Sequence, residues 1–202
     1  MELGINGLGQ VAENHHVGPM HPEYADLPKI EADPAAAKAM LEEAGLSDVE
    51  IELISIDGDW RMVTTDAIGA QLRDAGFNVK RTIIPGATFW NDWTKYAFST
   101  TNWGARPLGV QVYGLAYKSG EAWNEFGWAN EEFDALLADA LAIADVDKRR
   151  EVVAKAEKLI QDEGVTIQPY WRTLTNFTKK NLGGAGHHIS FEFHPDEVYW
   201  KA

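Results

Sequence analysis

The amino-acid sequence predicts an α/β fold in which a mixed sheet is flanked by helices and a helical hairpin lies toward the C-terminal half. Two observations carry this prediction. Between residues 33 and 103, segments with helical spacing alternate with segments typical of strands, the order expected for a layer built from crossover connections. Between residues 130 and 164, two successive segments place apolar residues three and four positions apart, which favours two packed helices.

The first helix is expected to begin at Asp33, which can cap its N-terminus, with Pro34 in the first position and Gly45 at its end. The five elements expected next, in chain order, are a strand at 49–56, a helix at 60–77, a strand at 78–85, a short aromatic helix at 88–96 and a strand-like run at 97–103. The preceding residues 1–32 are rich in glycine, proline and histidine without a sustained period, so we expect an extended lead-in segment.

The helical hairpin is expected to use Asn130 as the cap of a helix at 131–144 and Asp147 as the cap of a helix at 148–164. Their apolar stripes would drive them together and onto the sheet, because each fully buried Leu or Ile contributes roughly 1.5–3 kcal/mol. Three short strand-like runs follow, at 165–171, 174–180 and 189–194.

Composition excludes several classes of partner. The net charge of −13 argues against a nucleic-acid partner and against docking on an anionic membrane. No apolar run approaches the roughly 20 residues of a membrane span, so no direct membrane insertion of this chain is expected. The chain has no cysteine, which excludes disulfides and thiolate metal ligands. The opening residues MELGINGLGQ lack the features of a secretion signal; if the parent protein is exported, we expect this chain to start downstream of that signal.

Catalytic and metal motifs are weak. The sequence contains no HExxH, no GxSxG and no serine in an activating pattern, so we predict no catalytic residue, no metal site and no cofactor. The segment GINGLG lacks the preceding strand and the following capped helix of a phosphate loop. The six histidines are expected at the surface; they are His15, His16, His21, His187, His188 and His194.

Aromatic residues on loops are the feature most suggestive of a binding site. The segment TNWGARPLGVQVYG, residues 101–114, places Trp103, Arg106 and Tyr113 among three glycines and a proline. Loops that follow strands in α/β folds commonly bind ligands, and aromatic faces with a few fixed polar groups suit a solute pocket. The candidate ligand-binding residues are Trp103, Gly104, Arg106, Tyr113, Trp123 and Asn124. The alternative is that these tryptophans only cover the helical hairpin, and for Trp128, just before the Asn130 cap, that alternative is favoured.

Four segments in this order resemble the C-terminal lobe of the family 5 extracellular solute-binding proteins, the dipeptide- and oligopeptide-binding components of ABC importers. The four segments are DPAAAKAMLEEAG, AIGAQLRDAGFNVKRTIIPGATFWNDW, NWGARPLGVQVYG and NEEFDALLADALAIADVDKRREVVAKAEKLIQDEGVTIQPYW. The resemblance implies a lobe of the periplasmic-binding-protein type, with residues 33–164 as the ligand-binding lobe and 165–202 as a return segment that crosses to the other lobe. It also implies a periplasmic protein that closes on a peptide or other small solute and delivers it to ABC permease subunits.

Within the resemblance, Trp103 would form a flat wall of the cleft, Gly104 would let the backbone approach the solute, and Arg106 would supply a cation. Family members commonly carry an aspartate in this loop, which pairs with the α-ammonium of a peptide. This chain has no acidic residue between Trp103 and Ser119, which argues against capture of a free amino terminus. Arg106 instead suits a carboxylate or phosphate.

Two other functions stay open from the residues alone. A glycan-active hydrolase would need two carboxylates facing each other across a cleft. A protein-interaction module would dock a partner through its aromatic loop, and a large, flat apolar patch would favour it.

Overall fold

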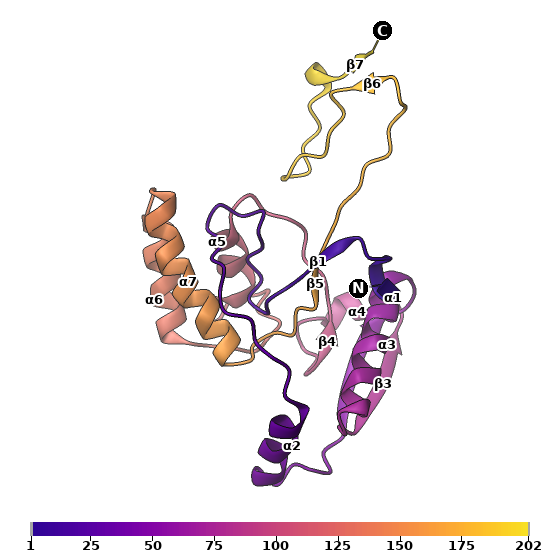
Figure 1. Ribbon diagram of the computed structural model, residues 1–202, viewed down its shortest axis with the longest axis vertical. Helices are drawn as coiled ribbons and strands as arrows, with labels where there is room; N and C mark the ends of the chain where they lie inside the picture. Colours follow the sequence, from indigo (N-terminus) through magenta and orange to yellow (C-terminus); the bar gives the residue numbers. More distant parts are fainter. Residues whose placement is uncertain (1, 202) are drawn as a thin grey trace.

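The sheet at the centre of the α/β part has three parallel strands in a computed structural model that describes residues 2–201 (Figure 1). Its central strand is β2 (Ile51–Ile56), flanked by β3 (Val79–Ile84) and β4 (Ser99–Thr100). The parallel strands are joined through α3 (Asp59–Asp74) and α4 (Gly86–Asp92), as crossover connections require. The α/β prediction is confirmed, although the strands are divided among three small sheets.

The two faces of β2 are covered by different helices because successive side chains of a strand point to opposite sides. Leu53 lies against Gly69 of α3 on one face. On the other face, Ile54 and Ile56 form a small core with Phe89 of α4. This arrangement holds the end of β4, and the loop that follows it, at one edge of the layer.

The first predicted helix is present as α2 (Pro34–Glu43). The Asp33 carboxylate accepts a hydrogen bond from the backbone N–H of Ala36 at 2.9 Å, and Gly45 follows the helix with φ of +70°. None of the side chains of α2 is buried, and the helix lies apart from the rest of the lobe in Figure 1.

The helical hairpin consists of α6 (Glu131–Ala142) and α7 (Val146–Asp162), which lie side by side (Figure 1). The cap of α7 is Asp145, two residues before the predicted Asp147; its side chain accepts from the backbone N–H of Lys148. The hairpin packs on α5 (Gly109–Val112) and the π-helical turn η1 (Tyr113–Tyr117), and not on the sheet as expected. The reason is that α5 and η1 present an apolar face that completes this larger core. The buried side chains of this core include Val110, Tyr113, Tyr117, Phe133, Leu137, Val153 and Ile160.

The segment 1–32 is extended over much of its length but is packed into the lobe. It contains α1 (Glu2–Ile5), which contacts α3, and β1 (Gly9–Val11), which pairs antiparallel with β5 (Tyr170–Arg172). Residues 170–172, which fall in the predicted return segment, therefore lie in the lobe and form a two-stranded ribbon with the lead-in.

Beyond Arg172 the chain extends away from the lobe as a separate arm (Figure 1). The arm contains a second ribbon, formed by β6 (Leu182–Gly183) and β7 (Tyr199–Trp200), and the 3₁₀ turn η2 (Pro195–Glu197). The strand-like runs predicted at 174–180 and 189–194 are not strands in the structure. They have no neighbouring strand with which to pair, and the side chains of Phe177 and Phe193 are 95% and 71% exposed.

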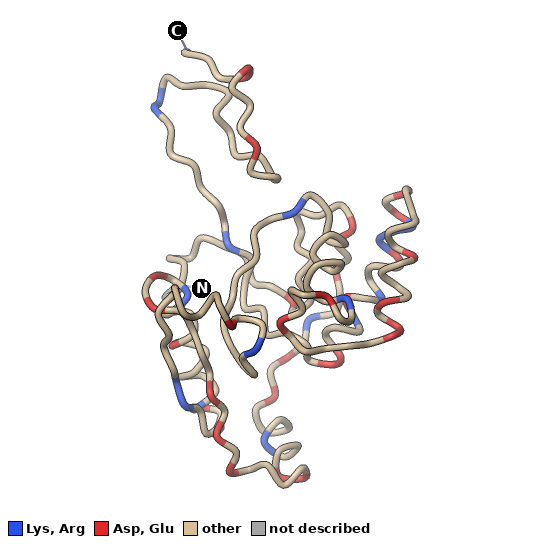
Figure 2. Tube along the Cα trace, turned by 180° about the vertical axis from the view of Figure 1, so that it is seen from behind, with Lys and Arg blue, Asp and Glu red and all other residues tan. Residues whose placement is uncertain are grey.

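Acidic residues outnumber basic ones along most of the trace, with Lys and Arg interspersed among them (Figure 2). Of the helices in the part that the structure describes, none has the length and apolar character needed to cross a bilayer.

Candidate functional site

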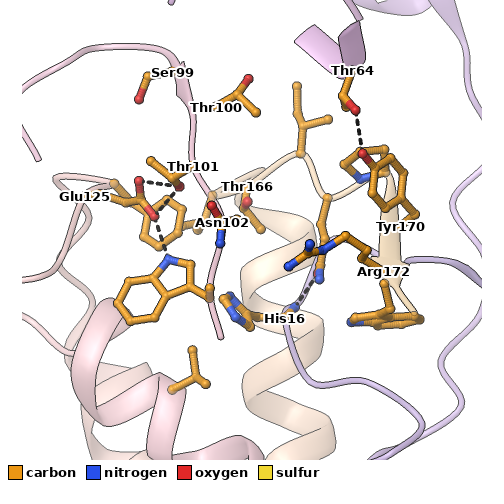
Figure 3. A pocket seen from close by; sticks show the side chains of 18 of the residues that line it. His16, Thr64, Ser99, Thr100, Thr101, Asn102, Glu125, Thr166, Tyr170 and Arg172 are labelled. Atoms are coloured by element: carbon orange, nitrogen blue, oxygen red, sulfur yellow. Dashed lines mark hydrogen bonds between the residues drawn. The ribbon is translucent and has the colours of Figure 1, made fainter. Parts of the chain in front are cut away.

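A cavity of about 310 Å³ opens where the α/β layer meets the helical core. One wall is the loop after β4, which carries Trp103, and the facing wall is the segment Val165–Arg172 leading into β5. The lead-in segment contributes His16 and His21 between them. Figure 3 shows side chains from these separate segments converging on one space. This volume lies at the lower end of the range for small-molecule sites.

Trp103 and Glu125 form the polar centre of the first wall. The Glu125 carboxylate accepts hydrogen bonds from the indole Nε1 of Trp103 at 2.8 Å and from the Thr101 hydroxyl at 2.7 and 2.8 Å (Figure 3). Burial raises the pKa of Glu125, and these two donors oppose that rise by stabilising the ionised form. The cavity therefore contains a carboxylate that the sequence analysis did not predict, supplied by the loop after η1.

Gly104 and Arg106, two of the predicted ligand-binding residues, line the cavity together with Trp103. A Cβ added to Gly104 would lie 3.6 Å from the Phe191 side chain, which is ordinary contact distance, so nothing in the chain itself requires glycine here. The Arg106 guanidinium makes one long contact, 3.4 Å, to the Ala105 carbonyl, and within residues 2–201 no carboxylate lies in ion-pair range of it.

Tyr113 does not line the cavity. Its side chain is 1% exposed in the helical core, and its hydroxyl donates a hydrogen bond of 2.6 Å to the backbone carbonyl of His15. The expectation of a loop at this position is wrong because Tyr113 begins η1, where it packs against Tyr117 and Phe133. The structure gives this tyrosine a packing role that ties the lead-in segment to the core.

Trp123 and Asn124 lie outside the cavity lining but beside Glu125 in the chain. The Trp123 ring is 48% exposed, with its centroid 6.0 Å from that of Trp103. The Asn124 amide donates to the backbone carbonyls of Trp128 and Lys118 at 2.7 and 3.1 Å. Asn124 thus folds the loop back on itself and fixes where Glu125 points.

The histidines of the lead-in segment are not surface residues, in contrast to the expectation. His15 is fully buried and His21 is 8% exposed. The His16 ring lies in the cavity with Nδ1 3.0 Å from the Tyr117 hydroxyl (Figure 3). Burial, followed by the nearby His21 and His15, lowers the pKa of His16 to about 3, so this ring is neutral at physiological pH.

A pair of reciprocal hydrogen bonds holds the lead-in segment to the far wall. The backbone N–H of His16 donates to the Gln168 side chain at 2.8 Å, and the backbone N–H of Gln168 donates to the Asn14 side chain at 2.7 Å. Asn14 and His16 both have positive φ, 61° and 69°, which non-glycine residues seldom adopt. The two bonds stabilise this unusual turn and thereby place the His16 ring in the cavity.

The far wall carries aromatic and cationic groups that the sequence analysis did not single out. The guanidinium of Arg172 lies over the Trp60 ring, 4.6 Å from its centroid, and the Tyr170 hydroxyl is 2.5 Å from the Thr64 hydroxyl (Figure 3). Their one signal in the sequence is the aromatic and basic cluster PYWR, residues 169–172, which falls in the predicted return segment.

Chemically, the cavity offers a flat aromatic wall, one carboxylate and two arginines. Among the described residues that line it, Glu125 is the only acidic side chain. The lining therefore has no pair of facing carboxylates, and it suits binding of a small polar or zwitterionic molecule.

Comparison with known proteins identifies relatives of one class. The sequence matches the family of bacterial extracellular solute-binding proteins, family 5 (middle region), over residues 1–125. It is 26% identical over 175 residues to the probable deoxycholate-binding periplasmic protein YgiS of Escherichia coli K12, covering 83% of this chain and 33% of that protein.

Solved structures of substrate-binding proteins share the fold. The ABC transporter substrate-binding protein CtaP of Listeria monocytogenes superposes with a TM-score of 0.79 at 16% identity, over 96% of this chain and 42% of CtaP. The oligopeptide-binding protein AppA of Bacillus subtilis, solved with a nonapeptide, superposes with a TM-score of 0.78 at 19% identity, over 100% of this chain and 44% of AppA. The chain thus spans a third of the curated relative and less than half of either solved structure. With the family match covering more than half of its residues, the chain belongs to the family 5 bacterial extracellular solute-binding proteins.

Proposed function

We propose that this chain is the C-terminal lobe of the substrate-binding component of an ABC importer, and that its cavity is one half of an inter-lobe site for a peptide-like or other small solute. The parent protein would act in the periplasm and deliver the solute to permease subunits in the membrane. The observation that carries the proposal is the cavity itself, which combines the Trp103 ring with the Glu125 carboxylate on a chain of this family.

The charges in the cavity suit a zwitterionic solute. Glu125 can accept hydrogen bonds from an ammonium group. The cavity can therefore bind an amino terminus although the loop after β4 lacks an aspartate. Arg106 and Arg172 can each bind a carboxylate through two parallel hydrogen bonds. Trp103 would offer its ring to the apolar part of the solute, and Gly104 its backbone.

The arm supports the proposal that a second lobe belongs with this one. Phe177, Phe193 and Trp200 are 95%, 71% and 64% exposed, and several large apolar side chains exposed on one short segment are typical of a surface that another part of the protein covers. In the proposed arrangement the arm is the return segment, and the other lobe covers these rings.

Binding would act by population shift. A solute that contacts both lobes has a higher affinity for the closed state and so increases its population. The closed form would then be the one that the permease recognises. A single lobe cannot close, so we expect the 202-residue chain alone to bind the solute weakly.

The test is to purify the full-length parent protein and identify the molecules that co-purify with it by mass spectrometry. Titration of the identified solute should then show that Trp103→Ala weakens binding by roughly 1–3 kcal/mol, the range for aromatic stacking on nucleobases. Trp90→Ala is the matched control, because Trp90 is an exposed tryptophan of α4 outside the cavity lining. Unchanged affinity of Trp103→Ala, or a parent protein that binds no solute, would contradict the proposal.

The two other candidate functions receive less support. The hydrolase needs two facing carboxylates, and Glu125 is the only acidic residue in the described lining. The interaction module needs a flat apolar patch, whereas Trp103 lies in the wall of a concave space.

A further inference from the structure

A cluster of side chains that can bind a metal lies in the arm and includes none of the residues that line the cavity. His188, Glu192 and His194 fall within seven residues between β6 and η2. Each can offer one ligand atom, and the three atoms lie within 4.8 Å of one another. The two histidines are half-buried and the glutamate is exposed.

The distances within the cluster are close to those of a coordination site. Zinc binds imidazole nitrogen at about 2.0–2.1 Å and carboxylate oxygen at about 2.0–2.2 Å, so two ligand atoms at a tetrahedral angle lie roughly 3.3–3.5 Å apart. Glu192 Oε2 lies 3.3 Å from His194 Nε2 and 3.8 Å from His188 Nδ1. Small side-chain rotations would bring all three atoms to coordination distance.

Of the two histidine nitrogens near Glu192, one has no hydrogen-bond partner among residues 2–201 and the other accepts a single long bond. His194 Nε2 is shielded from solvent and has no hydrogen-bond partner within the described residues. His188 Nδ1 accepts one hydrogen bond of 3.2 Å from the backbone N–H of Ser190. An accepting nitrogen carries no hydrogen, as a metal ligand requires. A metal at Nδ1 would replace that single long bond.

We propose that His188, Glu192 and His194 form a binding site for a divalent first-row transition metal of the zinc type. Two imidazoles and one carboxylate are a donor set that suits Zn²⁺, and the ligand spacing is within the range of short-loop sites. Three protein ligands leave a fourth position for water. Binding would cross-link the loop that joins β6 to η2 and so order this part of the arm.

His187 provides an internal control because it adjoins the cluster but is not part of it. Its ring packs edge-on against Phe191, with the centroids 5.3 Å apart. Replacing His187 removes a neighbouring imidazole without removing a proposed ligand. The Phe191 side chain lies beside Gly104 of the lobe, and the substitutions leave Phe191 in place, so we expect the lobe to stay folded.

The experiment is a titration of the untagged 202-residue chain with Zn²⁺ at pH 7.5, by calorimetry and by competition with a chromophoric chelator. One ion should bind per chain, and His188→Ala and His194→Ala should each weaken binding by about tenfold or more, while His187→Ala should remain within about twofold. Glu192→Gln should also weaken binding, because it removes the charge of the oxygen donor.

Absence of stoichiometric Zn²⁺ binding would overturn the proposal. So would a His188→Ala/His194→Ala double variant that binds as tightly as the unmodified chain, or equal losses in the His187 and His188 variants. Circular dichroism and the urea midpoint of the lobe serve as folding controls for each variant. The cavity plays no part in this titration, so its result is independent of the proposed transport function.

Discussion

Replacing Glu157 with glutamine is expected to stabilise the protein, and increasingly so as the pH rises. Glu157 lies on α7 with no exposed surface, and burial raises the pKa of its carboxyl to about 9. The negative charges of Glu13 and Glu23 raise this pKa further, while the backbone of Ala25 acts in the opposite direction. The nearest cationic candidate, His15 Nδ1, is 3.9 Å away, but burial lowers the pKa of that histidine, so it is neutral at physiological pH.

The direction and size of the effect follow from proton linkage. The folded chain keeps the proton on Glu157 up to about pH 9, whereas the unfolded chain loses it near 4.5. Between these values the unfolded state binds fewer protons, so the free energy of unfolding falls by about 1.4 kcal/mol per pH unit. The stability that the protonated Glu157 allows is therefore fully present below pH 4.5 and is lost as the pH rises toward 9. Glutamine, which is neutral throughout, should abolish the dependence, and between pH 6.5 and 8.5 the gap between the two proteins should widen by about 2–3 kcal/mol.

The assay is urea unfolding followed by tryptophan fluorescence at half-unit steps across that interval. Glu151→Gln is the control, because Glu151 is an exposed residue of the same helix. A difference between Glu157→Gln and the unmodified protein that stays constant with pH would refute the reasoning, since a change in packing alone would give that result.

Two smaller predictions concern residues expected at the binding site. Tyr113→Phe removes one of two donors to the buried carbonyl of His15, which keeps the backbone N–H of Val17. It should lower the free energy of unfolding by about 0.5–1.5 kcal/mol, with unchanged solute affinity in the parent protein. A loss of affinity without a loss of stability would instead place Tyr113 in the site. Gly104→Ala adds a Cβ that lies 3.6 Å from Phe191, and it should change the free energy of unfolding by less than about 0.5 kcal/mol. Urea unfolding measures this change. A larger loss would mean that the loop after β4 cannot accept a side chain.

Local patterns in the sequence were sufficient for most helices and for the parallel strands. The caps at Asp33 and Asn130 are formed by those residues, because a cap depends only on neighbours two or three positions away. The loop predicted at Tyr113 is wrong for a local reason as well. The apolar positions 110, 113 and 117 have helical spacing, but the glycines between 104 and 114 favoured a loop.

The polar groups of the site could not be found in the same way, because they come together through tertiary contacts. The Glu125 carboxylate reaches Trp103 from 22 residues further along the chain, and His16 meets Gln168 from 152 residues away. No spacing rule links such positions. The buried histidines illustrate the same limit, since polar residues in a segment without periodicity are mostly exposed, and only the packing of that segment shows that these are not.

The cavity depends on the two segments that the sequence analysis placed outside the lobe. Pairing of β1 with β5 sets the position of Tyr170 and Arg172, and the bonds between Asn14, His16 and Gln168 fix the wall beside it. A lobe limited to residues 33–164 would keep Trp103 and Glu125 but lose the facing wall and both histidines. The lead-in and the first residues after 164 are therefore structural parts of the candidate site, and the chain leaves the lobe as the arm only after β5.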